Sequence, residues 1–196
     1  MPLDDATTAP RARRLRVTIG SRCLDDTPAP AHPRDVPKDG PAARWAKGVI
    51  WTWMRAGEKP DLFLSGYARG PDRWGALAAY HLSVPRLEFR LDGRRWTNER
   101  PARGPMARWT EETMPASKAS PKAWKDWCLA RDRAMGAAAM RAADEGWDVS
   151  LLAVIAPWSR THGTEYSMEF FQHPQIKIEA LVAPLALRPA SATPVG

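Results

Sequence analysis

The chain has 196 residues, of which 44% are hydrophobic and 26% are charged, and its formal net charge is +7. That composition is sufficient for a buried core and excludes a disordered or fibrous chain, while the length fits a single domain. No apolar run approaches the roughly 20 residues that cross a bilayer, and the N-terminus lacks the apolar centre of a signal peptide. We therefore expect a cytoplasmic protein with no membrane partner.

Both ends of the chain are polar and contain proline, over residues 1–13 and 184–196. Such segments are typical of loosely ordered tails. They leave residues 14–183 as the expected single domain, and no internal repeat divides it further.

The first half of this domain alternates strand and helix patterns. Residues 15–19 alternate apolar and polar side chains, and residues 61–64 are a short apolar run, as expected for strands. Between them, residues 41–56 repeat apolar side chains at helical spacing. A second helix is predicted to begin at Pro71, because proline is favoured at the first helical position, and residues 87–91 alternate again as a strand.

The second half continues the alternation after a gap. A long helix is predicted over 120–146, with Ser120 as its N-cap. Residues 149–156 are almost continuously apolar, which indicates a strand buried on both faces of a parallel sheet. A short helix ending at Phe171 and a last strand over 176–182 complete the domain.

Strands that alternate with helices predict an α/β fold with a parallel sheet. We expect a three-layer, Rossmann-like open sheet of about five strands with helices on both faces. Residues 92–119 have no periodicity and are expected to form a long loop, and a loop of that length in a compact domain commonly has a function.

The positive charge is concentrated in two segments. Four arginines in residues 11–16 contribute +4, and five arginines with one glutamate in residues 94–108 contribute another +4. Since these segments total +8 and the whole chain +7, the rest of the chain sums to −1. The expected picture is a basic arm and a basic loop on a nearly neutral body.

The chain has two cysteines, Cys23 and Cys128. Neither has a second cysteine or a histidine at metal-ligand spacing, so we expect no metal site and two reduced thiols. No cofactor is predicted from the sequence.

Three loops leave a predicted strand end and carry glycine, a hydroxyl residue and arginine before a helix. They are residues 20–22, 65–72 and 159–164. In parallel sheets, ligands bind beyond the carboxyl ends of the strands. Glycine lets a phosphate approach the backbone, and a helix N-terminus offers free N–H groups. The convergence of the three loops therefore predicts a phosphate-bearing ligand.

In this order, the loops resemble the SLOG superfamily (SMF/DprA–LOG), and most closely its YspA-like members. Those proteins carry a G-S-R turn, then G-G-A-R-G-A-D-R, a helix with R-N-R-x-M, and a G-x-G-T turn. The matching segments here are 20–22, 65–73, 131–135 and 162–164, so the resemblance covers roughly residues 15–182.

The resemblance implies a nucleotide-derived ligand. The LOG branch hydrolyses the N-glycosidic bond of cytokinin nucleoside monophosphates, with an arginine from R-K-x-x-M and a glutamate from G-G-x-G-T-x-x-E. Arg131 matches that arginine, four residues before Met135, whereas the glutamate position is Ser167, flanked by Glu165 and Glu169. The resemblance therefore implies ligand binding more directly than phosphoribohydrolase activity.

The candidate site residues fall into three groups. The catalytic candidates are Arg131, Glu165 and Glu169; the two glutamates are four residues apart and share a helix face, which suits general acid/base work or simply a solvated surface. Tyr67 and Trp158 are candidates for stacking on a base. The predicted ligand- and phosphate-binding residues are Gly20, Ser21, Arg22, Ser65, Gly66, Arg69, Gly70, Asp72, Arg133, Gly163 and Thr164.

Each charged candidate also has a structural alternative. Arg131 lies on the apolar stripe of its helix, where an unpaired buried charge is costly. It therefore either faces a ligand phosphate or pairs with a carboxylate, for which Asp72 is the candidate. Asp72 could itself cap the second helix, since acidic residues favour the first turn, and Arg133 could be simple surface.

The leading functional hypothesis is a SLOG-type domain that binds a nucleotide, such as a nucleoside monophosphate or an ADP-ribose derivative. It would act either as a sensor or as an N-glycosidic-bond hydrolase. The alternative is a DprA-like nucleic-acid-binding protein that uses the basic segments 11–16 and 94–108 and binds in a salt-dependent way. A third reading is a scaffold whose site has decayed. Many members of the superfamily are dimers, so a homodimer is one expectation.

Overall fold

The computed structural model describes residues 11–21, 24, 39–66, 68, 70–89, 106–109, 121–159 and 163–189. For residues 106–109, 121–125 and 127 it describes the backbone alone.

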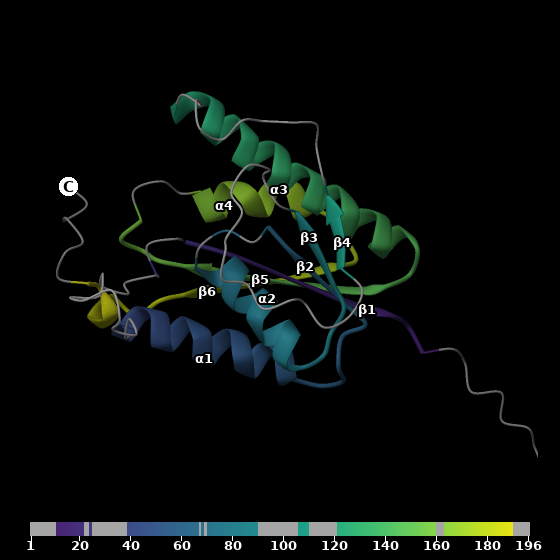
Figure 1. The fold of residues 1–196 in the computed structure, drawn as a ribbon, viewed down its shortest axis with the longest axis horizontal. Helices are drawn as coiled ribbons and strands as arrows, with labels where there is room; N and C mark the ends of the chain where they lie inside the picture. The colour runs from purple at the N-terminus through teal and green to yellow at the C-terminus, as the bar shows by residue number, and fades with distance from the viewer. Residues whose placement is uncertain are drawn as a thin grey trace, which may run out of the picture.

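The centre of the molecule is a parallel sheet of six strands in the order β4-β3-β2-β1-β5-β6. Five of the strands lie where the sequence predicts them, and the α/β, Rossmann-like fold is confirmed (Figure 1). The strands are β1 (Arg14–Gly20), β2 (Leu62–Ser65), β3 (Arg86–Phe89), β4 (Met106–Trp109), β5 (Asp148–Ile155) and β6 (Ile176–Val182).

The sixth strand, β4, falls inside the segment expected to be a loop. Met106–Trp109 pairs in register with Arg86–Phe89 of β3. Four residues are too few to show a period of their own, so this strand depends on its neighbour for hydrogen bonds rather than on a local sequence signal. The prediction of an uninterrupted loop over 92–119 was therefore wrong at these four positions.

Helices cover both faces of the sheet, which gives three layers (Figure 1). Helices α1 and α2 lie on one face, and α3 and α4 lie on the other. A 3₁₀ turn, η2, continues α4, and a second turn, η3, follows β6. The bounds are α1 (Pro41–Arg55), α2 (Pro71–His81), α3 (Pro121–Asp144), α4 (Gly163–Met168), η2 (Glu169–Phe171) and η3 (Leu185–Leu187).

Two hydrophobic cores result, one on each side of the sheet. The core under α1 and α2 includes Phe63 and Trp74, as the apolar stripes of these helices predict. The core under α3 includes Leu15, Val17 and Met135. Strand β1 is buried on both faces because it runs through the middle of the sheet, which explains its low exposure along most of its length.

The strand order reverses at β1. From β1 the chain proceeds outward through β2, β3 and β4, and then returns to place β5 on the other side of β1. In open α/β sheets, the crevice at such a switch point, beyond the carboxyl ends of the strands, is where ligands bind. Here that point lies between Gly20 of β1 and Val154 of β5, which are register partners.

Candidate functional site

The loops that the sequence selects at the ends of β1 and β5 do meet at the switch point. The backbone N–H of Ser21 donates to Val154 O at 3.0 Å. Its hydroxyl accepts from the N–H of Ala156 at 3.1 Å and lies 3.2 Å from the hydroxyl of Thr164. Since Ser21 and Thr164 are both buried, their hydroxyls join β1, β5 and the start of α4 into one rigid corner.

Arg131 of α3 is buried, at 6% exposed. Its Nε and Nη2 donate to Oδ1 of Asp132 at 2.8 and 2.6 Å. Its Nη1 donates to the carbonyl oxygen of Gly66 at 3.2 Å. The guanidinium therefore anchors the loop after β2 to α3.

Asp132 is the direct carboxylate partner of Arg131, and Asp72 is a second one that acts on it electrostatically. Burial lowers the pKa of Arg131, but the negative charges of Asp132 and Asp72 outweigh it, so that the pKa is raised above its ordinary value. Arg131 is thus a fixed cation. These three side chains together carry a net charge of −1, from one arginine and two aspartates.

Ser167 extends this cluster to α4. Its hydroxyl donates to Oδ2 of Asp132 at 2.7 Å, and it is buried. Ser167 is the residue at the position of the LOG glutamate. It contributes a hydrogen bond to the carboxylate of Asp132 rather than a carboxylate of its own.

Sequence reasoning did not select Asp132, although it follows Arg131 directly. Adjacent helical residues do not share a face, so nothing in the spacing indicates a pair. The arginine side chain is long enough to turn back to its neighbour, and the burial of both groups makes the pairing favourable. In the sequence, the only sign of this ion pair was that an acidic residue directly follows an arginine on the apolar stripe of the helix.

The glycines near the site are explained by packing inside the protein. A Cβ on Gly66 would lie 2.8 Å from Asp72 Oδ2 and 2.9 Å from Arg131 Nε, so glycine is what lets these charges approach the loop. A Cβ on Gly20 would collide with the ring of Pro71. Gly70 precedes α2 with φ of 87°, a conformation that favours glycine.

Asp72 lies in the first turn of α2, where the N-cap residue is Gly70 and no side chain caps the helix. Asp72 is buried, and its backbone carbonyl accepts a hydrogen bond from the hydroxyl of Ser65 at 3.0 Å. Its first-turn position suits the helix dipole, and its charge supports Arg131. Of the two structural alternatives for Asp72, the electrostatic pairing with Arg131 describes its surroundings, whereas the N-cap position of α2 belongs to Gly70.

The residues of α4 divide into inward and outward groups. Thr164 and Ser167 are buried, whereas Gly163, Glu165 and Glu169 are exposed. The two glutamates flank the inward-facing Ser167 and leave carboxylates at the surface. Arg133 is also exposed, with its guanidinium 5.4 Å from the ring centre of Phe170.

Trp158 follows β5 but lies in the core under α1, at 4% exposed. Its indole N–H is buried and has no hydrogen-bond partner among the described residues. So little of the ring is accessible that stacking on a base is not favoured at this position. The other stacking candidate, Tyr67, lies outside the described residues, as do Arg22 and Arg69.

The basic arm lies at the amino edge of the sheet, where β1 begins, away from the switch point. Arg11 pairs with Glu58 at 2.9 Å, and Arg14 lies 3.5 Å from the same carboxylate. Arg16 donates to the carbonyl oxygen of Trp53 and packs over its ring at 4.7 Å. Partial burial and the charge of Arg14 lower the pKa of Arg16. These contacts hold β1 against the end of α1.

The second basic segment, 94–108, lies outside the described residues except for the backbone of 106–108. No group of three or more metal-ligating side chains occurs in the described part of the chain. Within the same part, no helix is long and apolar enough to cross a membrane.

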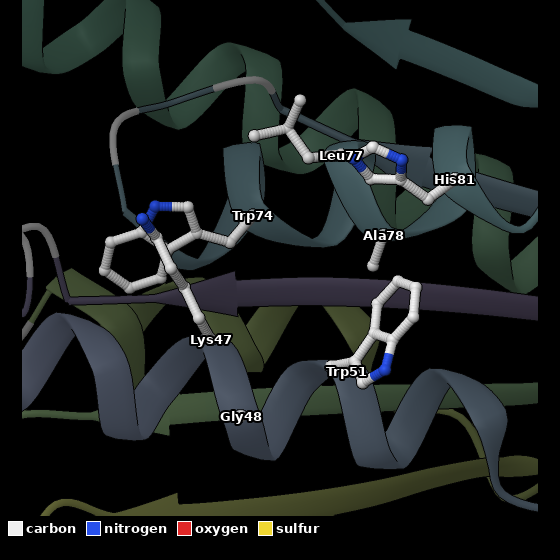
Figure 2. A pocket seen from close by; sticks show the side chains of 7 residues that line it. All are labelled: Lys47, Gly48, Trp51, Trp74, Leu77, Ala78 and His81. Carbon is white, nitrogen blue, oxygen red and sulfur yellow. The ribbon is translucent and has the colours of Figure 1, made fainter. Parts of the chain in front are cut away.

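A separate apolar groove lies between α1 and α2 on the outer side of that helix layer, and Figure 2 shows its lining. Its volume is about 340 Å³, and its lining includes two small residues, Gly48 and Ala78. Trp51 and Leu77 are 37% and 42% exposed. The lining consists of Lys47, Gly48, Trp51, Trp74, Leu77, Ala78 and His81, none of which is a predicted ligand residue.

Fold and switch point together define a three-layer α/β domain of Rossmann-like architecture. Comparisons of the chain with protein-family models, with curated proteins and with solved structures find no match.

Proposed function

We propose that this protein binds a nucleotide or nucleotide-derived ligand at the carboxyl edge of its sheet, at the switch between β1 and β5. The observation that carries the proposal is the convergence of three selected loops on that edge. Ser21 and Thr164 meet across the switch at 3.2 Å, and Arg131 holds the third loop through Gly66 at 3.2 Å. The resemblance to SLOG domains, whose ligands are nucleotide-derived, supports the same ligand class.

The charges of the described residues bear on which side chains contact the phosphate of the ligand. Arg131 is engaged with Asp132, and with Asp72 these groups sum to −1, so this cluster does not provide a free cation for phosphate. The phosphate contact is instead assigned to the arginines that the loop motifs contribute, Arg22 and Arg69. The Arg131 cluster then acts as the scaffold that positions the loop after β2.

Two modes of action are compatible with this site. In the enzyme mode, Glu165 or Glu169, both exposed on α4, stabilises positive charge on the ribosyl carbon as the glycosidic bond breaks. In the sensor mode, the ligand binds without turnover. The inward hydrogen bond of Ser167 to Asp132 leaves the LOG-type catalytic position without a carboxylate, which favours the sensor mode.

Calorimetry against a panel of nucleoside monophosphates and ADP-ribose tests the proposal. We expect at least one of these to bind, and we expect Arg69→Ala to weaken that binding about tenfold or more, as for loss of a charge-assisted phosphate contact. The matched control is Arg141→Ala, an exposed arginine near the end of α3. Absence of binding across the panel, or equal affinities for the two variants, contradicts the proposal.

Turnover is tested separately by chromatography of the same incubations. Release of free base that is lost in Glu165→Gln or Glu169→Gln supports the enzyme mode. Tight binding with no base release supports the sensor mode. The nucleic-acid alternative has less support because Arg11, Arg14 and Arg16 already have partners within the protein.

A further inference from the structure

Strand β6 forms one edge of the sheet, and no described strand pairs with its outer side. It pairs with β5 along its whole length, from Ile176 to Val182. Just beyond it, the N–H of Ala183 donates to Ile155 O at 2.8 Å. Because backbone groups alternate in direction along a strand, the N–H and C=O groups of Ile178, Ala180 and Val182 face outward. This edge therefore offers a row of backbone donors and acceptors.

The end of the same strand also exposes apolar side chains. Val182 is 57% exposed, and Leu185 in the turn that follows is 70% exposed, the two highest values among the large hydrophobic residues described. An exposed edge with apolar residues beside it is a template for pairing with another strand.

The charges on β6 are complementary to those on a second copy of the same strand, so we expect a second copy to pair with this edge. Lys177 and Glu179 are both exposed and lie on one face of the strand, two residues apart. If two β6 strands pair antiparallel about a two-fold axis at Ile178, each Lys177 lies directly opposite Glu179 of the partner subunit. Both ion pairs then form at positions between the hydrogen-bonded pairs, where facing Cα atoms approach to about 4.5 Å.

Neighbouring registers lack this complementarity. An axis at Glu179 would place two glutamates opposite each other, and like charges directly opposite are destabilising. An axis at Ala180 would place Glu179 opposite an apolar side chain, Leu181. We propose that this protein forms an antiparallel β6–β6 homodimer centred on Ile178, which joins the two sheets into one continuous twelve-stranded sheet, twice the six strands of each copy.

The apolar groove between α1 and α2 is a less suitable surface for self-association than the edge of β6. Helix α1 carries Arg44, Lys47 and Arg55 and no acidic residue. Two copies that meet through this face would bring basic side chains together, whereas β6 pairs opposite charges.

The contact is small, since it is built on one seven-residue strand from each copy. Interfaces of this size are typical of weak, concentration-dependent association. Because the two ion pairs are exposed, added salt weakens them. The fraction of dimer is therefore expected to increase with protein concentration and to decrease on dilution.

Sedimentation velocity from micromolar to millimolar protein tests the proposal. The full chain is expected to shift from 21.8 kDa toward twice that mass. Glu179→Lys should weaken the dimer about tenfold or more, because two lysines then face each other across the interface. Adding Lys177→Glu to that variant restores complementary charges and should recover the dimer.

Two controls accompany these variants. Lys59→Glu reverses an exposed charge outside β6 and should leave the dimer unchanged, as should Leu77→Asp in the α1–α2 groove. Circular dichroism verifies that each variant is folded, which matters for Lys177→Glu because Lys177 pairs with Asp148 at 2.7 Å. A monomer at every concentration, a dimer that survives Glu179→Lys, or a double variant that fails to recover would each overturn the β6 dimer.

Discussion

Replacing Arg131 with methionine removes a buried charge while retaining a side chain of similar length. In the folded protein this arginine is 6% exposed and donates three hydrogen bonds, two to Asp132 and one to Gly66. Methionine removes the cation that acts on the buried Asp132 and Asp72, and it removes the donor from Arg131 to the carbonyl of Gly66.

The expected cost follows from the kind of interaction that is broken. Removal of one partner of a buried ion pair typically costs 3–5 kcal/mol, because the charge that remains is uncompensated. For a chain of this length, about 1 kcal/mol corresponds to roughly 2–4 °C in Tm. Arg131→Met should therefore lower the melting temperature by about 6–20 °C.

The assays are thermal denaturation for the melting temperature and urea denaturation for the free energy of unfolding, both followed by far-UV circular dichroism, with Arg133→Met as the matched control. Arg133 is two positions along the same helix, is exposed, and contacts the ring of Phe170. Its loss should cost no more than about 1 kcal/mol, as for an exposed cation–π contact. Equal free energies of unfolding for the two variants would refute a structural role for Arg131 in the cluster.

Three glycine substitutions give further predictions from the same denaturation assay. Gly66→Ala should cost about 1–3 kcal/mol, because its Cβ would press on Arg131 Nε. Gly136→Ala should cost at least as much, since its Cβ would collide with the backbone carbonyl of Phe170, which shifts less easily than a side-chain tip. Gly48→Ala, with no atom within 4 Å of its Cβ, should instead stabilise α1 by about 0.5–1 kcal/mol. A loss of stability in the Gly48 variant, or none in the other two, would contradict the packing described for these positions.

Long or strongly apolar elements were predictable from the sequence. The apolar stripe of α1 and the continuous apolar run of β5 arise because these elements are buried. Their patterns therefore identify the type of secondary structure and also which face is buried. Strand β4 was not predictable, since Met106–Trp109 becomes a strand by pairing with β3 and carries too little pattern of its own.

The meeting of predicted loops at one edge of the sheet was predictable from the sequence, whereas the contacts of Arg131 were not. The loop positions bring Ser21 to Thr164, as the rule for carboxyl edges requires. The partner of Arg131 was a different matter, because the pairing with Asp132 depends on how one long side chain bends in a buried space. Periodicity describes which face a residue occupies and contains no information on such a bend.

The position of β1 at the centre of the sheet also determines when the protein can fold. Its partner on one side, β5, is encoded near the other end of the chain, with Arg14 in register with Asp148. The helix that covers Leu15 and Val17, α3, likewise comes late. During synthesis, one edge of β1 therefore has no partner strand, and one apolar face stays uncovered, until most of the chain has emerged. Such long-range pairing slows folding, and it leaves the incompletely folded chain open to aggregation.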